Sequence, residues 1–479
     1  MLRRTKIIAT LGPATDQPGV LAGLIAAGVD LVRLNFSHGD AETHRQRAKA
    51  VRELSQSMRR HVGILADLQG PKIRIARFKD GKVELKEGQD FALDIRLDPN
   101  AGDATQVGIT YEPLARDVKP GNTLLLDDGR IVMDVVKTDG YRVECKVTVG
   151  GELSNNKGIN LLGGGLSAAA LTDKDKEDIK TAAEIDVDYV AVSFPRSADD
   201  IREARRLVLE AGSHAGIIAK IERAEALEVI EDIIQASDAI MVARGDLGVE
   251  IGDANLPPVQ KRLIGLARSL DRAVITATQM MESMIYNPLP TRAEVFDVAN
   301  AVVDGTDAVM LSAETASGKY PVKAVEAMDR VCRETEKQPN VRTSKHRMEM
   351  QFQRIDEGIA MATMYLANHT PIRLIAALTE SGSTPLWMSR ISSGIPIFAF
   401  TRHLKTCGRV TLYRGVFPIL FFNDSSDHAV VNRAIVQTLR EYGQVKNGDR
   451  VIITKGDLTG VQGGTNALKV ITVGEGLTP

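Results

Sequence analysis

Eight short apolar stretches, seven of them followed directly by a stretch with helical periodicity, constrain the fold of this chain most strongly. Three of them precede a region of different texture, and five follow it. They are the segments 6–10, 29–35, 62–68, 187–193, 216–222, 238–243, 273–278 and 307–314. Eight βα units are the number that closes a (β/α)8 barrel. The sequence therefore predicts an α/β fold built on a TIM barrel.

The region between the third and fourth predicted strands, residues 71–165, is punctuated by turn signals such as "KDGK", "KPGN" and "DDGR". Asp-Gly and Pro-Gly pairs about every ten residues are typical of a small antiparallel β domain. We therefore expect a small β-barrel lid domain inserted into the TIM barrel. The barrel itself would comprise residues 1–70 and 166–343.

The last part of the chain, residues 344–479, has a separate pattern of elements. It contains the helical stretch "RIDEGIAMATMYLANHT" and the apolar runs "RLIAALT", "IPIFAFT", "RVIITKG" and "ALKVITV". A chain of 479 residues is long enough for more than one hydrophobic core. We therefore expect an independent open α/β domain at the C-terminal end.

The charge balance restricts the classes of partner. The 60 Lys and Arg residues against 62 Asp and Glu give a formal net charge of −2. Binders of nucleic acid or membrane surfaces normally carry a basic excess, so we expect neither partner. A small anionic ligand needs only a local cluster of Arg and Lys, and remains compatible with this composition.

The cysteines and the apolar runs bear on location. Cys145, Cys332 and Cys407 lie far apart without a CxxC pair, which fits a reducing compartment and no disulfide framework or zinc knuckle. The first residues lack the apolar core of a signal peptide, and no apolar run approaches ~18 residues. We expect a cytoplasmic protein.

Polar residues cluster where the predicted barrel strands end. These positions hold Arg33, Asn35, Asp67, Ser193, Lys220, Glu222, Arg244, Asp246, Thr278, Ser312 and Glu314. Active sites of TIM barrels lie at the carboxyl ends of the strands, so this clustering predicts a functional site.

Two carboxylates, Glu222 and Asp246, would end adjacent strands. Mg²⁺ prefers one or two protein carboxylates together with substrate oxygens, so the pair suits this ion. An equally weighted alternative is that both are structural acids paired with Lys220 and Arg244.

Lys220 lies in the apolar run "IIAKI", two residues before Glu222. Residues two apart on a strand share a face, so the two side chains should be neighbours. The ammonium could stabilise a transferring phosphoryl group or an enolate oxygen. A salt bridge to Glu222 and a Schiff-base lysine are the alternatives, and the spacing does not separate them.

The segment "VRLNFSHGD" would aim Arg33, Asn35 and Ser37 in one direction at a strand end. Arginine is suited to bidentate phosphate binding, and the Asn and Ser oxygens can act as ligands or as a helix cap. Beyond the hinge-like Gly70-Pro71, Arg74 could follow a moving lid onto a nucleotide, or be a solvated cation in a linker.

A hydroxyl-rich turn, "ALTESGST" (377–384), follows an apolar run of the last domain. Its hydroxyl side chains are Thr379, Ser381, Ser383 and Thr384. Such a turn at a helix N-terminus can bind phosphate, and it can equally be a helix cap.

Two glycine-containing segments do not indicate other nucleotide-binding folds. "TASGKY" (315–320) lacks the first glycine of a P-loop and the hydroxyl after its lysine, and "GGG" at 163–165 is not a dinucleotide fingerprint.

These segments together resemble the pyruvate kinase family. The similar stretches are "TKIIATLGPAT", "RLNFSHGD", "LADLQGPKIR", "AKIERAEAL", "MVARGDLGVE", "ATQMMESM", "PTRAEVFDVANAV" and "MLSAETASGKYP", in family order over the barrel and insert. In the last domain, "LTESGST" and "SRISSGIPIFAFT" resemble the bacterial form that responds to AMP or sugar monophosphates.

The resemblance implies Mg²⁺-dependent phosphoryl transfer from phosphoenolpyruvate to ADP in glycolysis, giving pyruvate and ATP, with Mn²⁺ as a possible substitute. It also implies a homotetramer and a regulatory last domain that binds a phosphorylated effector through the 377–384 turn.

The resemblance further implies a role for each matching residue. Lys220 would be the transition-state lysine, Glu222 and Asp246 would bind Mg²⁺, and Arg33 would donate to the phosphate. The substrate carboxylate would bind to the backbone of Gly245 and Asp246 and to Thr278, and a relay of Thr278 and Ser312 would protonate the enolate. The nucleotide would be bound by Arg74, Lys157, Asn35 and His38.

One departure from the family concerns K⁺. Many members hold K⁺ with residues that match Asn35, Ser37, Asp67 and the carbonyl of Leu68, and carry "TKGPE" where this chain has "LQGPK". Leu68 and Lys72 thus replace a threonine and a glutamate. Because a lysine ammonium can supply the charge of a monovalent cation, we predict activity without K⁺.

Two other functions are compatible with parts of the pattern. A metal-dependent barrel lyase or aldolase acting on a pyruvate enolate would need the same lysine, metal and arginine, but would not use Arg74 and Lys157 on a lid. A catalytically silent sensor of phosphorylated metabolites is disfavoured because every charged position is retained.

Overall fold

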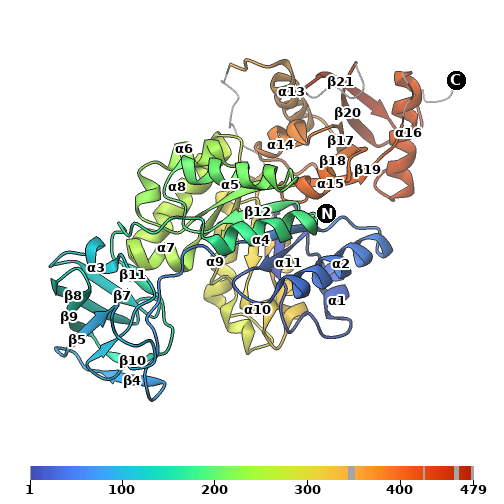
Figure 1. Ribbon diagram of the computed structural model, residues 1–479. Coiled ribbons are helices and arrows are strands. Elements are labelled where there is room, and N and C mark those ends of the chain that lie inside the picture. The colour runs from blue at the N-terminus through green and yellow to red at the C-terminus, as the bar shows by residue number, and fades with distance from the viewer. Residues whose placement is uncertain (1, 343–350, 424, 426, 458–462, 476–479) are drawn as a thin grey trace.

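Eight parallel strands form a closed barrel in the computed structural model, which describes residues 2–342, 351–423, 425, 427–457 and 463–475 (Figure 1). The strand order is β1-β16-β15-β14-β13-β12-β3-β2. The strands are β1 (Lys6–Thr10), β2 (Leu31–Asn35), β3 (Gly63–Asp67), β12 (Tyr189–Val192), β13 (Gly216–Ile221), β14 (Ala239–Ala243), β15 (Ala273–Ala277) and β16 (Ala308–Leu311). All eight predicted strands are present, and the predicted fold class is confirmed.

Alternation along the strands builds two hydrophobic layers. In β1, Ile8 packs with Leu65 and Met241 inside the barrel, whereas Ile7 packs with Leu24 in the layer between the strands and the helices. The helices are α1 (Val20–Ala27), α2 (Ala41–Ser57), α4 (Asp173–Glu184), α5 (Ala198–Glu210), α6 (Ile230–Ala236), α7 (Arg244–Ile251), α8 (Leu256–Ser269), α9 (Arg292–Asp304), α10 (Ala313–Ala316), α11 (Pro321–Thr335) and α12 (Pro339–Arg342).

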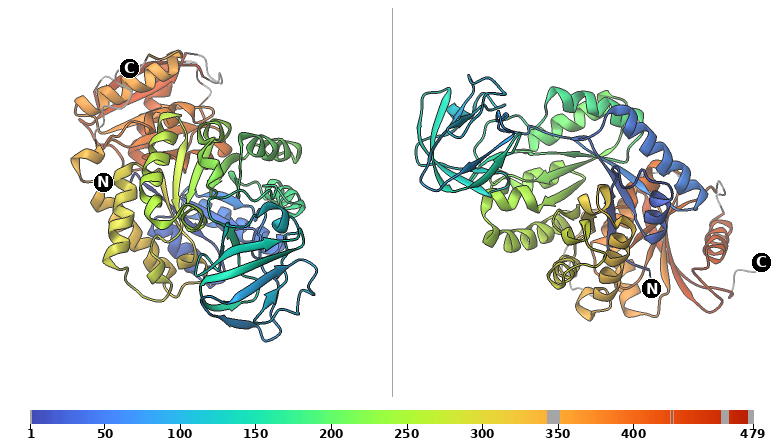
Figure 2. Two further views of the ribbon diagram at one scale, coloured as in Figure 1. Left: turned by 90° about the vertical axis from the view of Figure 1, so that its left-hand side faces the viewer. Right: turned by 90° about the horizontal axis from the view of Figure 1, so that it is seen from below.

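The insert between β3 and α4 has its own core and stands beside the barrel (Figures 1 and 2). It contains a six-stranded sheet of order β11-β7-β8-β9-β5-β6 and a two-stranded sheet of β10 and β4. Its elements are β4 (Lys82–Leu85), β5 (Asp90–Asp94), β6 (Gln106–Val107), α3 (Leu114–Asp117), β7 (Thr123–Leu126), β8 (Ile131–Thr138), β9 (Arg142–Val149), β10 (Gly151–Ser154) and β11 (Ile159–Leu161).

The C-terminal region forms a five-stranded sheet of order β19-β18-β17-β20-β21, with β21 antiparallel to β20. Its elements are α13 (Ile355–His369), β17 (Leu374–Leu378), α14 (Ser383–Ser389), β18 (Ile397–Thr401), α15 (Leu404–Val410), β19 (Val416–Leu420), α16 (His428–Glu441), β20 (Arg450–Gly456) and β21 (Thr465–Thr472). The strand β19, which contains Pro418, was not predicted from the sequence. Proline is tolerated there because β19 is an edge strand.

This C-terminal region packs against the amino ends of the barrel strands. At the start of β12, the hydroxyl of Tyr189 donates to the carbonyl of Arg409 at 2.6 Å. Next to the start of β16, the buried Asp307 forms an ion pair with Arg390. The insert and the C-terminal region therefore lie on opposite sides of the barrel (Figure 2), and the carboxyl ends of the strands face the insert.

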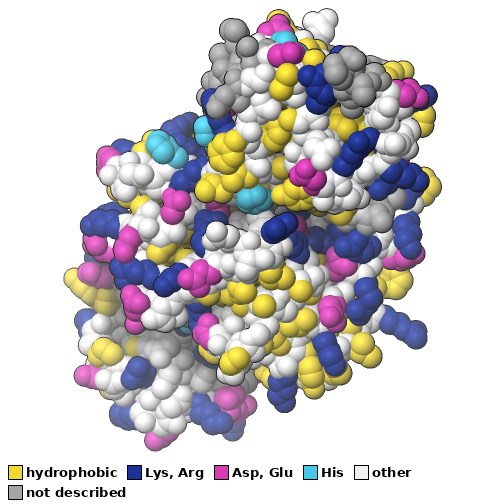
Figure 3. Space-filling view, turned by 90° about the vertical axis from the view of Figure 1, so that its right-hand side faces the viewer, with side chains coloured by type: hydrophobic (Ala, Val, Ile, Leu, Met, Phe, Trp, Pro, Cys, Tyr) yellow, Lys and Arg dark blue, Asp and Glu magenta, His cyan; other side chains and the backbone are white. Residues whose placement is uncertain are grey.

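No helix in the described parts of the chain is long and apolar enough to cross a membrane. On the face shown in Figure 3, basic and acidic side chains are interspersed.

Candidate active site

Lys220, near the end of β13, is at the centre of a charged cluster. Its Nζ lies 3.0 Å from Glu222 Oε1 and 3.2 Å from Asp67 Oδ1, and it donates to Ser193 Oγ at 2.7 Å. Burial alone would lower the pKa of Lys220, but the Asp67 and Glu222 carboxylates outweigh burial and raise it. The lysine is therefore a fixed positive charge, and the predicted proximity of Lys220 and Glu222 is observed.

Arg33 at the end of β2 extends the cluster. Its Nε donates to Asp67 Oδ2 at 2.6 Å, so the buried Asp67 lies between two cations. Burial opposes ionisation of Asp67, yet Lys220 and Arg33 hold its pKa below the usual range. Two cationic groups thus stand side by side at the strand ends, as an anionic phosphate requires.

The two predicted metal ligands also lie in this region. Glu222 is buried, and its Oε2 accepts the backbone N–H of Phe194 at 2.9 Å. Asp246 lies in the first turn of α7. Burial, with repulsion from Asp246 and Asp67, raises the pKa of Glu222 to about 7 against the opposing effect of Lys220. This crowding of carboxylates fits a bound divalent cation, because a cation would relieve it.

Among the residues that the structure describes, no group of three or more His, Cys, Asp or Glu side chains is arranged to hold a metal. Glu222 and Asp246 are thus not joined by a third His, Cys, Asp or Glu side chain of the described residues in an arrangement that could hold a metal. A pair of this kind fits Mg²⁺, which takes its remaining ligands from water and substrate.

Thr278 follows β15 in an unusual turn. Thr278 and Gln279 both have positive φ, at 66° and 54°. The carbonyl of Thr278 accepts from Arg244 Nη2 at 2.7 Å, and Thr278 Oγ1 accepts the backbone N–H of Gly245 at 2.8 Å. Arg244 pairs with Asp297 at 2.7 Å, so the alternative that Arg244 is the partner of Asp246 does not describe this site.

Ser312 follows β16 and carries an unsatisfied hydroxyl. Its Oγ is inaccessible and has no hydrogen-bond partner among the described residues, whereas its backbone N–H donates to Glu314 Oε2 at 2.6 Å. A buried polar atom without a protein partner is uncommon, and a buried water is the usual partner of such an atom.

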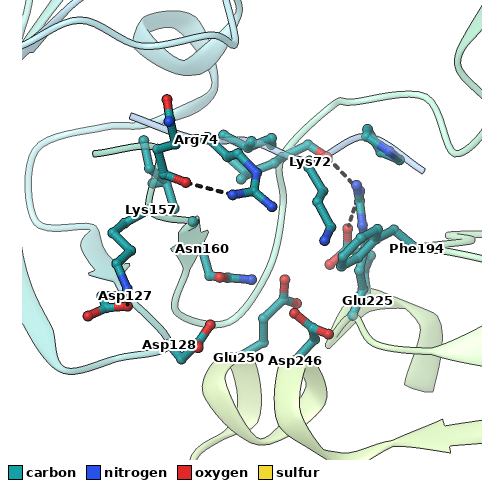
Figure 4. A pocket seen from close by; sticks show the side chains of 17 residues that line it. Lys72, Arg74, Asp127, Asp128, Lys157, Asn160, Phe194, Glu225, Asp246 and Glu250 are labelled. Atoms are coloured by element: carbon teal, nitrogen blue, oxygen red, sulfur yellow. Dashed lines mark hydrogen bonds and ion pairs between the residues drawn. The ribbon is translucent and has the colours of Figure 1, made fainter. Parts of the chain in front are cut away.

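A pocket of about 330 Å³ lies between the insert and the barrel (Figure 4). Its lining includes Pro71, Lys72, Ile73, Arg74, Asp127, Asp128, Asn156, Lys157, Gly158, Ile159, Asn160, Leu166, Phe194, Arg223, Glu225, Asp246 and Glu250. Arg74 Nη1 donates to the carbonyl of Asn156 at 2.6 Å, and Lys157 Nζ lies 2.7 Å from Asp127 Oδ1. Asp246 thus faces the same space as the cations of the insert.

Two of the four residues predicted to bind the nucleotide lie at this pocket, and two do not. Arg74 and Lys157 line the pocket, whereas Asn35 and His38 are not part of its lining. Burial and the charges of Lys72, Arg33 and Arg74 lower the pKa of His38.

Several lining residues were not identified from the sequence as site residues, notably Asp127, Asp128, Glu225 and Glu250. "DDGR" was interpreted only as a turn. Asp127 has a positive φ of 51°, a conformation that is uncommon for a non-glycine residue, but nothing in the sequence alone places this turn opposite Asp246.

Three of the predicted monovalent-cation ligands, Asn35, Asp67 and Leu68, already contact protein donors. Asn35 Oδ1 accepts the N–H of Ser37 at 3.1 Å, and the carbonyl of Leu68 accepts from Ser193 Oγ at 2.8 Å. Both oxygens of Asp67 contact cations, as described above. Lys72 lines the pocket, and burial together with the charges of Arg74 and Lys220 lowers the pKa of its ammonium against the opposing effect of Asp246 and Glu222.

The predicted effector residues lie at the turn between β17 and α14. Thr379 Oγ1 accepts the N–H of Gly382 at 2.9 Å, and the hydroxyls of Ser381 and Ser383 are 2.9 Å apart. Thr384 is buried, with its hydroxyl 3.0 Å from that of Thr465. Three of the four hydroxyls thus gather at the turn, and that of Thr384 is directed to β21.

Fold and site together define an α/β-barrel enzyme with a charged site at the carboxyl ends of its strands, next to an inserted β domain. Residues 2–325 match the family described as pyruvate kinase, barrel domain, and residues 357–471 match pyruvate kinase, alpha/beta domain. The chain therefore belongs to the pyruvate kinase family.

Individual relatives agree with this assignment. The chain is 58% identical to pyruvate kinase II of Salmonella typhimurium and 55% identical to pyruvate kinase of Haemophilus influenzae, each over 98% of this chain and 99% of the relative. A crystal structure of a pyruvate kinase from Cryptosporidium parvum is similar with a TM-score of 0.91 and 34% identity, covering 98% of this chain and 96% of that one.

Proposed function

We propose that this enzyme transfers the phosphoryl group of phosphoenolpyruvate to ADP in a Mg²⁺-dependent reaction, as a step of glycolysis. The observation that carries the proposal is the cluster of Lys220, Arg33 and Asp67 beside Glu222, at the strand ends of a pyruvate kinase barrel. Neither an aldolase nor a silent sensor is supported by the family assignment.

Each side chain has a defined task in this proposal. Arg33 and Lys220 hold the phosphoryl group and offset the charge that develops on it and on the enolate oxygen. Glu222 and Asp246 would hold Mg²⁺, which when bound adds positive charge at the phosphoryl oxygens. The backbone N–H groups of Gly245 and Asp246, with Thr278, receive the substrate carboxylate.

The chemical steps balance when one proton is taken up from solvent. The bond between phosphorus and the enol oxygen breaks as a bond forms between phosphorus and a β-phosphate oxygen of ADP, which Arg74 and Lys157 position. The enolate then takes a proton at its methylene carbon through Thr278 and the free hydroxyl of Ser312. The products are ATP and pyruvate.

A coupled assay tests the activity directly. With phosphoenolpyruvate, ADP and Mg²⁺ present, pyruvate and ATP should form in equal amounts. Pyruvate released without ATP, or no turnover at all, would refute the proposal and favour a lyase or a sensor.

We further propose that the enzyme does not require K⁺. The rate in K⁺-free buffer should lie within about twofold of the rate at 100 mM K⁺, because the ammonium of Lys72 lines the same pocket as Asp246 and is attracted by its carboxylate. The variant Lys72→Glu should lose most activity without K⁺ and recover part of it when K⁺ is added. A large loss of wild-type activity in K⁺-free buffer would contradict this prediction.

We also propose that the 377–384 turn binds the phosphate of an activating metabolite. Thr379→Ala should abolish the decrease in half-saturating phosphoenolpyruvate caused by AMP or ribose 5-phosphate, because it removes a hydroxyl at the turn. Thr370→Ala alters an exposed hydroxyl before β17 and is the matched control. Equal activation of both variants would place the effector elsewhere.

Domain boundaries, cellular location and oligomeric state can also be proposed. We propose domain boundaries of 1–70 with 166–343, 71–165 and 344–479, a cytoplasmic location and a homotetramer. Exposed apolar side chains at and before α9, Tyr286, Leu289 and Phe296, support a subunit contact. A monomeric mass in solution would refute the tetramer.

A further inference from the structure

Three consecutive glycines, Gly163 to Gly165, carry the chain from the insert back to the barrel. Their φ angles are 85°, 78° and 105°, a region that residues with a side chain rarely adopt. They follow β11 after one residue, Leu162, and Asn160 of β11 lines the pocket, as does the nearby Lys157. The turn therefore connects the pocket-facing part of the insert to the barrel.

The barrel side of this connection consists of charged residues that follow β13 and end α7. Glu225 Oε2 accepts the N–H of Gly165 at 3.2 Å, and the carbonyl of Glu250 accepts the N–H of Gly163 at 3.0 Å. Arg223 Nη1 donates to the carbonyl of Leu166 at 3.0 Å and lies 3.4 Å from Glu225 Oε1. The barrel thus binds the backbone of the turn through residues of two neighbouring βα units.

The middle glycine is closely packed against one of these residues. A Cβ atom added at Gly164 would lie 2.0 Å from Glu225 Oε2, so a side chain there displaces the carboxylate. A Cβ atom added at Gly163 would meet nothing within 4 Å. The two positions share the left-handed conformation and differ in their contact with Glu225.

Glu225 is also close to the chemistry. It lies three residues after Glu222, and it lines the same pocket as Asp246, Lys157 and Asn160. In Figure 4, Asn160 projects from the insert toward the side of the pocket that carries Glu250 and Asp246. A shift of the glycine turn would therefore move the insert's pocket residues relative to Asp246.

We infer that Glu225 is a positioning residue that holds the Gly163–Gly165 turn and so fixes the insert at the distance that the nucleotide substrate requires. This inference rests on the proposed function of the pocket. It predicts that losing the contact weakens ADP binding, whereas phosphoenolpyruvate, which binds at the strand ends, is little affected.

Matched alanine variants separate this role from backbone strain. Gly164→Ala should raise the KM for ADP about tenfold relative to Gly163→Ala, as expected for loss of one hydrogen bond to a charged group. The KM for phosphoenolpyruvate and the thermal unfolding midpoint should be similar in the two variants. Glu225→Ala should reproduce the effect on ADP, and Glu225→Gln, which keeps an acceptor oxygen for Gly165, should recover most of it.

A double variant completes the test. In the Glu225→Ala background, Gly164→Ala should have no larger effect on the KM for ADP than Gly163→Ala has. If Gly164→Ala and Gly163→Ala raise the KM for ADP equally in the wild-type background, the glycines serve only the turn conformation and the inference is overturned. A wild-type enzyme that does not phosphorylate ADP would instead overturn the proposed function.

Discussion

Replacing Lys220 by alanine should lower kcat about 1,000-fold or more, the scale on which preorganised charge in an active site acts. Its ammonium stands between Asp67 and Glu222 at 3.2 and 3.0 Å, and these carboxylates raise its pKa, so the charge is present throughout the neutral pH range. A steady-state assay with saturating phosphoenolpyruvate, ADP and Mg²⁺ measures the loss.

The structural consequence of this substitution has to be measured separately. Without Lys220, two buried carboxylates lose a positive partner, which is destabilising. Lys220→Arg retains the charge and should unfold close to the wild-type temperature, yet its planar group cannot reproduce the point charge, and kcat should remain at least about 100-fold low.

Lys180→Ala is the matched control, because Lys180 is exposed on α4 and forms a surface ion pair with Glu177. Near-normal turnover of Lys220→Ala would show that the lysine is a structural partner of Glu222 and Asp67. That outcome would return the assignment to one of the alternatives left open by the sequence.

The barrel and the residues at its strand ends could be predicted because both depend on short-range periodicity. Alternation along β13 places Lys220 and Glu222 on one face, and the parallel arrangement brings Asp67 and Arg33 to the same edge. To predict that these side chains are neighbours, one needs only the boundaries of the strands and their order in the barrel. The charged cluster was therefore accessible from the sequence alone.

The contribution of the insert was not accessible in the same way. Asp127 and Asp128 line the pocket with Asp246, more than a hundred residues away, and only the packing of two domains brings them together. Similarly, Arg244 was predicted at the correct strand end, but its guanidinium supports the Thr278 turn and Asp297. Periodicity predicts on which face of a strand a side chain lies, whereas the neighbouring loops determine which residue that side chain contacts.

The glycine turn illustrates the same limit. "GGG" at 163–165 was not interpreted as a dinucleotide fingerprint, and the sequence contained no sign that Glu225 lies against Gly164. A side chain is excluded at Gly164 because the glycine turn connects the insert to the barrel and passes close to the Glu225 carboxylate.

The carboxylate pair provides the second large effect. Glu222→Gln and Asp246→Asn should each raise the Mg²⁺ concentration for half-maximal rate by about tenfold to 100-fold or more. Mutating a residue that only supports a metal ligand already lowers metal affinity by this factor, and these two residues are the proposed ligands themselves. Mn²⁺ binding, followed by calorimetry in the presence of phosphoenolpyruvate, gives a readout that is independent of turnover. Both variants should bind Mn²⁺ more weakly by a similar factor.

Glu250→Gln is the control for this pair, since Glu250 is a buried carboxylate that lines the same pocket but is not a proposed ligand. Its affinity for Mn²⁺ should stay within about twofold of the wild-type value.

The same measurements decide whether Glu222 is a metal ligand or a structural acid paired with Lys220, which the sequence left open. If Glu222 serves only as the ion-pair partner of Lys220, Glu222→Gln will lower kcat while the half-saturating Mg²⁺ concentration stays unchanged. If Glu222 is a metal ligand, the half-saturating concentration must rise, because the amide lacks the charge with which a carboxylate holds the ion.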